Sequence, residues 1–96
     1  MPQVVWTPTA LTDIQRHYDS LELVNLDAAR RAAQAIREAG DSLELNALRG
    51  TIVQAAMGLR KLKVEFGKAG FIIHYTVIEN EVLILKVYHG RENRPT

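Results

Sequence analysis

The stretch that decides the fold is Arg60-Lys61-Leu62-Lys63-Val64-Glu65-Phe66, followed by Phe71-Ile72-Ile73-His74-Tyr75-Thr76-Val77-Ile78 and Val82-Leu83-Ile84-Leu85-Lys86-Val87-Tyr88. The first segment alternates apolar and charged residues, which is typical of a strand with one buried face, and the alternation puts Lys61 and Lys63 together on the other face. The next two segments are rich in β-branched and aromatic residues, with short turns at 67–70 and 79–81. We therefore predict a three-stranded antiparallel meander.

The first half of the chain predicts two helices. Threonine can cap a helix and proline suits its first turn, so Thr7-Pro8 predicts a helix that begins at Pro8. Asn25 is the next N-cap, with Asp27 favourably placed in the first turn. Gly40 stands where a left-handed C-cap is expected.

The first helix carries an apolar stripe opposite a polar face. The stripe is formed by Leu11, Ile14, Tyr18 and Leu21, and the polar face by Asp13, Arg16 and Asp19. Alanines dominate positions 28–39, so the second helix can approach the first closely in an antiparallel hairpin joined near 22–25. Together with an extended run at 3–6 and an irregular connector at 41–58, these elements predict an α+β fold: an N-terminal β-strand, an antiparallel α-helical hairpin, and the meander forming one sheet.

Length and composition predict one small soluble domain spanning 1–96. The chain has 96 residues, of which 47% are hydrophobic and 24% charged, and no apolar run long enough to cross a bilayer or to form a signal peptide. We therefore expect a cytoplasmic protein. Cysteine is absent, and His17, His74 and His89 lack metal-ligand spacing, so neither a metal nor another cofactor is predicted.

The net charge of +1 conceals an asymmetry between the two halves of the chain. Residues 1–48 carry four basic and seven acidic side chains, a net charge of −3, whereas residues 49–96 carry eight basic and four acidic ones, a net charge of +4. A cationic sheet suits an acidic protein or a nucleic acid, although the same imbalance occurs in domains that bind neither.

The middle strand of the meander is apolar on both faces. Phe71, Ile73 and Tyr75 alternate with Ile72 and His74, but one helical hairpin can cover only one face of the sheet. The other face is therefore either open to a partner chain or a second copy, or covered by the connector. Both alternatives remain open from the sequence.

Five short segments in this order resemble the RelE/ParE toxins of type II toxin–antitoxin modules. The segments are Val5-Trp6-Thr7-Pro8-Thr9-Ala10-Leu11-Thr12-Asp13-Ile14, Asp27-Ala28-Ala29-Arg30-Arg31, Gly58-Leu59-Arg60-Lys61-Leu62, Phe71-Ile72-Ile73-His74-Tyr75 and Val87-Tyr88-His89-Gly90-Arg91. The resemblance implies a cytoplasmic toxin held inactive by a ParD-like antitoxin whose C-terminal segment wraps around it, encoded on a plasmid or chromosomal stabilisation module. The antitoxin contacts expected on the helical hairpin and the sheet face are Leu11, Ile72, His74 and Tyr88.

The superfamily contains two activities. RelE-like members cut messenger RNA on the ribosome, and this reading implies catalytic roles for Arg49, Lys61, Lys63 and Arg91. However, Ile72 replaces the arginine that such nucleases carry at the start of the next strand, and no tyrosine follows His89. Losing one charge stabiliser at a transition state costs several kcal/mol, about the cost of an oxyanion-hole donor, which argues against nuclease activity.

The chain end favours the second activity. His89-Gly90-Arg91-Glu92-Asn93-Arg94-Pro95 resembles the terminus of ParE-like toxins, which poison DNA gyrase by binding it and carry no catalytic residue. The target-binding residues implied are His89, Arg91, Arg94, Lys61 and Lys63. Direct contact with nucleic acid and an inert relative that only binds its antitoxin also remain open, and each of these side chains has an alternative role as a strand cap or a solvated charge.

Overall fold

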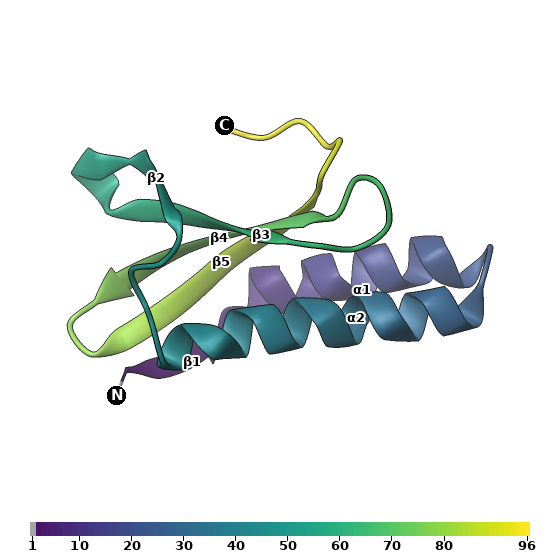
Figure 1. Cartoon of the computed structure of the whole chain (residues 1–96), viewed down its shortest axis with the longest axis horizontal. Helices are drawn as coiled ribbons and strands as arrows, with labels where there is room; N and C mark the ends of the chain where they lie inside the picture. Colours follow the sequence, from purple (N-terminus) through teal and green to yellow (C-terminus); the bar gives the residue numbers. More distant parts are fainter. Residues whose placement is uncertain (1) are drawn as a thin grey trace.

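A computed structural model describes residues 2–96 and shows two helices packed on one face of a sheet (Figure 1). The elements are β1 (Gln3–Trp6), α1 (Pro8–Glu22), α2 (Leu26–Asp41), β2 (Thr51–Gln54), β3 (Leu59–Val64), β4 (Phe71–Ile78) and β5 (Glu81–His89), with short 3₁₀ turns at Ser42–Glu44 and Ala55–Met57. Within the described residues the sheet has five strands in the order β1-β5-β4-β3-β2. β1 runs parallel to β5, and the other neighbours are antiparallel.

The predicted α+β class, helical hairpin and meander are confirmed, but the sheet is wider than predicted. β2 lies inside the segment predicted to be an irregular connector and pairs with β3, from Thr51 opposite Lys61 to Gln54 opposite Leu59. Its side chains are mostly exposed, so it shows none of the apolar alternation that identifies a half-buried strand. Its backbone pairing with β3 places it in the sheet.

The first strand of the meander, predicted to run to Phe66, also ends earlier than predicted. β3 stops at Val64, and Phe66 lies in the turn to β4, where its carbonyl accepts the Gly70 N–H at 2.8 Å. The Phe66 ring packs against Phe71 with 5.9 Å between ring centroids. Gly70 has a φ of +66°, which L residues rarely adopt. This turn fixes the end of the sheet.

Both predicted helix starts are confirmed. The Thr7 Oγ1 accepts the Ala10 N–H at 3.3 Å, and the Asn25 Oδ1 accepts the Ala28 N–H at 3.1 Å. Gly40, however, is not a cap, because α2 continues to Asp41. A Cβ on Gly40 would lie 2.4 Å from Trp6 Cζ2, so the glycine serves close packing instead. No helix within residues 2–96 is long and apolar enough to span a bilayer.

The core lies between the helices and the sheet. Its fully buried large side chains are Tyr75, Ile36, Leu43, Ile73, Ile84, Val82 and Val87. The Tyr75 hydroxyl donates to the Ala47 carbonyl at 2.8 Å and accepts the Gly50 N–H at 2.9 Å. Burial raises the pKa of Tyr75, so the hydroxyl keeps the proton it donates. One core tyrosine thereby anchors the connector that leads into β2.

The predicted polar face of α1 is wrong at Asp13, which is only 4% exposed and points to β5, while Leu11 on the predicted apolar stripe is 43% exposed. β1 ends at Trp6 beside Ile84, so among residues 2–96 no strand pairs with β5 on this side beyond that point. Asp13 Oδ2 accepts the Val87 N–H at 2.9 Å, and His17 Nε2 lies 2.8 Å from the Val87 carbonyl. We call this pair the Val87 clamp.

The clamp defines which ring nitrogen of His17 carries a hydrogen. A carbonyl oxygen can only accept, so His17 Nε2 carries a hydrogen. Burial lowers the pKa of His17. This effect is larger than that of the hydrogen bond to the Val87 carbonyl, which favours the charged ring and raises the pKa. Lys86 Nζ lies 3.3 Å from Asp13 Oδ2 and balances the carboxylate. The polar residues of α1 thus replace a neighbouring strand along the end of β5.

The face of the sheet opposite the helices lies on the side of the C-terminal segment 90–96 (Figure 1). Ile72 and His74, on this face of β4, are 7% and 3% exposed. His74 packs on the Tyr88 ring with 4.9 Å between centroids. The sequence left two alternatives for this face, an open surface or a cover formed by the connector. Neither describes the isolated chain fully. The chain's own residues shield the centre of this face, and the connector is not the sole cover.

We predict that Gly40→Ala destabilises the fold although alanine is the better helix former. Helix propensity favours the change by about 0.8–1 kcal/mol. The contacts of the new Cβ with Trp6 Cζ2 at 2.4 Å and Ile84 Cδ1 at 2.8 Å force repacking, which costs typically about 1–3 kcal/mol. Urea unfolding measures the net effect, with exposed Gln34→Ala as the control. A stabilised Gly40→Ala protein would contradict this packing.

The clamp predicts a pH dependence of stability. Burial lowers the pKa of both His17 and His74 from the ordinary 6.5, so the unfolded chain binds more protons near that pH. The free energy of unfolding should therefore be highest above about pH 7 and fall as the pH drops toward about 5. His17→Gln should flatten this profile, and His89→Gln, at an exposed ring, is the matched control. A profile unchanged by His17→Gln would refute the assignment.

Candidate functional site

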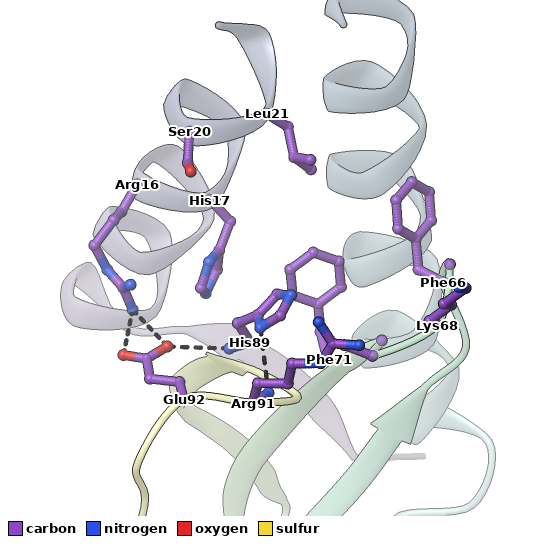
Figure 2. A pocket seen from close by; sticks show the side chains of 13 residues that line it. Arg16, His17, Ser20, Leu21, Phe66, Lys68, Phe71, His89, Arg91 and Glu92 are labelled. Carbon is purple, nitrogen blue, oxygen red and sulfur yellow. Dashed lines mark hydrogen bonds and ion pairs between the residues drawn. The ribbon is translucent and has the colours of Figure 1, made fainter. Parts of the chain in front are cut away.

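Two hollows lie near the end of the sheet where β5 gives way to the C-terminal segment. The first, the end groove, has a volume of about 730 Å³. It is lined by α1, the β3–β4 turn and the residues after β5: Arg16, His17, Ser20, Leu21, Phe66, Gly67, Lys68, Ala69, Gly70, Phe71, His89, Arg91 and Glu92 (Figure 2). The second, the basic hollow, has a volume of about 370 Å³.

Rings form the inner wall of the end groove. Phe71 lies 5.1 Å from the His17 ring and 5.8 Å from the His89 ring, between centroids. Phe66 lies beside Phe71 and receives the Arg31 guanidinium over its face at 5.8 Å. Offset and edge-on ring contacts of this kind add roughly 0.5–1.5 kcal/mol to the area they bury. The groove therefore has a firm apolar wall with a polar rim.

Glu92 holds the chain after β5 in position. One of its oxygens, Oε2, lies 3.1 Å from Arg16 Nη2, and Oε1 accepts the His89 N–H at 3.0 Å (Figure 2). Burial would raise the pKa of Glu92, but the His89 N–H and the Arg16 guanidinium outweigh it and lower the pKa below its ordinary value. The carboxylate is therefore ionised at neutral pH and ties the tail to α1.

His89 and Arg91, two of the predicted target-binding residues, lie on the rim of the end groove. The His89 Nδ1 accepts the Arg91 N–H at 3.2 Å, which folds the backbone into a tight turn (Figure 2). Both side chains are exposed. The guanidinium of Arg91 is available to an incoming partner because its backbone, and not its side chain, makes this bond.

The basic hollow is lined by Thr51, Lys61, Lys63, Ala69, Ile72, Gly90 and Arg94. It lies on the face of the sheet opposite the helices. Two rows of residues, paired from strand to strand, run side by side there. One row pairs Thr51 with Lys61, Lys61 with His74 and His74 with Lys86, and the other pairs Lys63 with Ile72 and Ile72 with Tyr88. The predicted shared face of Lys61 and Lys63 is thus part of a wider basic surface.

A close backbone contact separates the two hollows. The Gly90 N–H donates to the Gly70 carbonyl at 2.9 Å, and a Cβ on Gly90 would lie 2.0 Å from the Ala69 carbonyl oxygen. Arg91 lies on one side of this contact in the end groove, and Arg94 on the other in the basic hollow. A side chain at position 90 would push the tail away from the turn.

The four basic residues required by the nuclease interpretation do not line a common hollow. Lys61 and Lys63 line the basic hollow and Arg91 the end groove, while Arg49 lines neither and donates to Ser42 Oγ. Ile72 faces the basic hollow beside Lys63, where the nuclease pattern has an arginine. The nuclease reaction needs several cationic side chains around one phosphate, and each hollow contains only some of the four.

The predicted antitoxin contacts fall into two places. Leu11 is on the outer side of α1, whereas Ile72, His74 and Tyr88 lie on the sheet face that carries the basic hollow. Ile72 is only 7% exposed but lines the basic hollow, whereas His74, at 3%, is reached by a partner only after the covering residues move. Their role in antitoxin binding stays a prediction.

Sequence reasoning missed most of the end groove. The sequence placed Arg16 on the polar face of the first helix and gave His17 no binding role, although Asp13, Arg16 and His17 lie on neighbouring turns of α1. The available signal was the spacing of Asp13 and His17. They are four residues apart, so they lie on the same face of the helix. Within residues 2–96 no group of three or more His, Asp or Glu side chains could hold a metal ion.

Comparison with known proteins agrees with the resemblance seen in the sequence. The family described as "ParE toxin of type II toxin-antitoxin system, parDE" matches residues 4–94. A relative, Toxin RelE2 from Caulobacter vibrioides, is 35% identical over 90 residues, which cover 94% of this chain and 97% of the relative.

The fold agrees as well. A solved structure described as "Chromosomal ParDE TA system from P. aeruginosa" superposes with a TM-score of 0.79 at 26% sequence identity, and the match covers 93% of this chain and 96% of that chain. One of these two proteins is named after the RelE branch of the superfamily and the other after the ParE branch. On the match over 4–94, the chain belongs to the ParE toxin family of type II toxin–antitoxin systems.

Proposed function

We propose that this protein is a cytoplasmic toxin that stops growth by binding DNA gyrase, that it is neutralised by a cognate ParD-like antitoxin, and that the pair acts as a stabilisation module. Membership of the ParE family and the likeness to a ParDE system support the toxin and its antitoxin. The gyrase target rests on the family and on the form of the C-terminal segment. The role is recognition, without bond-making chemistry.

The observation that carries this proposal is the dispersal of the basic residues. A phosphoryl-transfer site must gather its charge stabilisers around one phosphate, at hydrogen-bond distance and in fixed orientation. Here Arg91 and the pair Lys61 and Lys63 line different hollows on either side of the Gly90 contact. Such a spread suits contacts along an extended partner surface better than catalysis at one atom.

The end groove supplies the features that a target-binding surface needs. Interface hot spots combine aromatic anchors with arginine, and the groove offers Phe66 and Phe71 behind an exposed Arg91. The Glu92 contacts with Arg16 and His89 hold this rim in place, which reduces the entropy lost on binding. We therefore assign His89 and Arg91 to the target contact.

A ribosome-dependent ribonuclease is the second candidate. It is favoured by one observation: Lys61, Lys63 and Arg94 converge on one hollow, so Arg94 from the tail partly replaces the cation missing at Ile72. The relative named Toxin RelE2 is compatible with this candidate. An inert relative that only binds its antitoxin would show no toxicity at any expression level.

Controlled expression in bacteria separates these functions. We predict early induction of an SOS reporter and filamentation while pulse-labelled protein synthesis continues. Translation arrest without SOS induction would refute gyrase as the target and make Lys61 and Lys63 the catalytic candidates. Absence of any growth defect, with the protein present and folded, would favour the inert relative.

We predict that Arg91→Ala lowers toxicity about tenfold or more, as expected for loss of a charged contact in an interface, with the fold retained. Colony-forming units after induction give the effect, and circular dichroism confirms folding. Arg30→Ala, which removes an exposed arginine of α2, is the matched control. Equal toxicity of the Arg91 and Arg30 variants would rule out a target contact at Arg91.

A further inference from the structure

The basic hollow gathers three cationic side chains in one place. Its described lining contains Lys61, Lys63 and Arg94 and no aspartate or glutamate side chain. Lys61 Nζ donates to the backbone oxygen of Thr96 at 3.3 Å, and Arg94 Nη1 donates to the carbonyls of Gly90 and Glu92 at 3.1 and 3.4 Å. Like charges held close together repel one another, so this hollow favours an anionic ligand.

Lys63 has an acidic neighbour, but the pair is weak. Its Nζ lies 4.0 Å from Glu65 Oε1, with side chains that are 67% and 87% exposed. Exposed ion pairs contribute little, about 0–1 kcal/mol, because water screens the attraction and two long side chains lose freedom. An anion bound in the hollow can therefore draw Lys63 away from Glu65 at small cost.

Two buried nitrogens beside the hollow have no hydrogen-bond partner within the described residues: His74 Nε2 and Arg94 Nε. Buried polar groups are nearly always paired, and leaving one unpaired costs roughly 1–3 kcal/mol. The pKa of His74 is lowered by burial and then by the charges of Arg94 and Lys61, and Lys86 is its partner on the neighbouring strand. These neighbours are cationic, and Arg94 Nε can only donate, so the group missing at Arg94 is an acceptor.

The floor of the hollow distinguishes between kinds of anion. Ile72 and Ala69 present apolar surface between the cations, and about 370 Å³ is more room than a single oxyanion requires. A carboxylate on a methylene stem matches this arrangement, with its head at the cations and its stem on Ile72. Lys61 Nζ already donates to the main-chain oxygen of Thr96, so this ammonium can bind an oxygen of a polypeptide. These features favour an acidic protein segment over a nucleic acid phosphate.

We propose that the basic hollow is a binding site for a glutamate or aspartate side chain of an acidic protein segment. The carboxylate pairs with Lys61 and Lys63 and accepts from Arg94, while its stem packs on Ile72. That this segment belongs to the antitoxin rests on the proposed function, whereas the binding chemistry does not.

The test uses the purified full-length chain, labelled with ¹⁵N, at low salt. Hexaglutamate is the probe, hexaglutamine the neutral control, and hexauridylate the phosphate-bearing competitor. Hexaglutamate should shift the signals of Lys61, Lys63, Ile72 and Arg94, and should raise the pKa of His74 because a bound negative charge offsets its cationic neighbours. Hexaglutamine should do neither.

Two single-charge variants make the test specific. Lys63→Gln should weaken hexaglutamate binding about fivefold to tenfold, and Lys68→Gln, which removes a lysine at the end groove, by less than about twofold. Equal losses in the two variants, or shifts outside the hollow, would overturn the proposal. If hexauridylate binds in the hollow and hexaglutamate does not, the proposal is also overturned and a nucleic acid site is favoured. None of these results depends on SOS induction or toxicity, so this proposal and the gyrase proposal fail separately.

Discussion

The clamp on Val87 is the interaction on which the rest of the structure depends. A sheet edge exposes unpaired N–H and C=O groups that must be satisfied by another strand, by water or by side chains. β1 is too short to cover the whole of β5, so Asp13 and His17 bind the Val87 N–H and carbonyl instead. This contact fixes α1 against the sheet, and with it Arg16, which holds Glu92 and the first residues of the tail.

The geometry of the tail then determines what the protein can bind. Because Gly90 packs tightly against the β3–β4 turn, Arg91 and Arg94 point to different hollows although they are three positions apart in sequence. The end groove has an aromatic wall and an exposed arginine, and the basic hollow has clustered cations over an apolar floor. Under the proposed function, these two chemically distinct surfaces would allow one small fold to contact a target and an antitoxin separately.

Local chemistry made part of this structure predictable. Thr7 and Asn25 cap helices through their own side chains, and the alternation around Lys61 and Lys63 assigns their face directly. Asp13 and Gly40 were misread because their roles come from β5 and Trp6, which are distant in sequence. β2 was missed because exposed side chains carry no periodic signal. The convergence of Arg94 on the strand lysines depends on the path of the tail, which no local pattern records.

Amide hydrogen exchange at Val87 tests the central claim most directly. If the Asp13 carboxylate holds this N–H, the amide should be protected to a degree comparable with the amides paired between β4 and β5, and Asp13→Ala should remove that protection selectively. Asp19→Ala, at an exposed position on the same helix, should leave it unchanged. A Val87 amide that exchanges in the native protein as fast as an exposed strand edge would contradict the clamp and the account built on it.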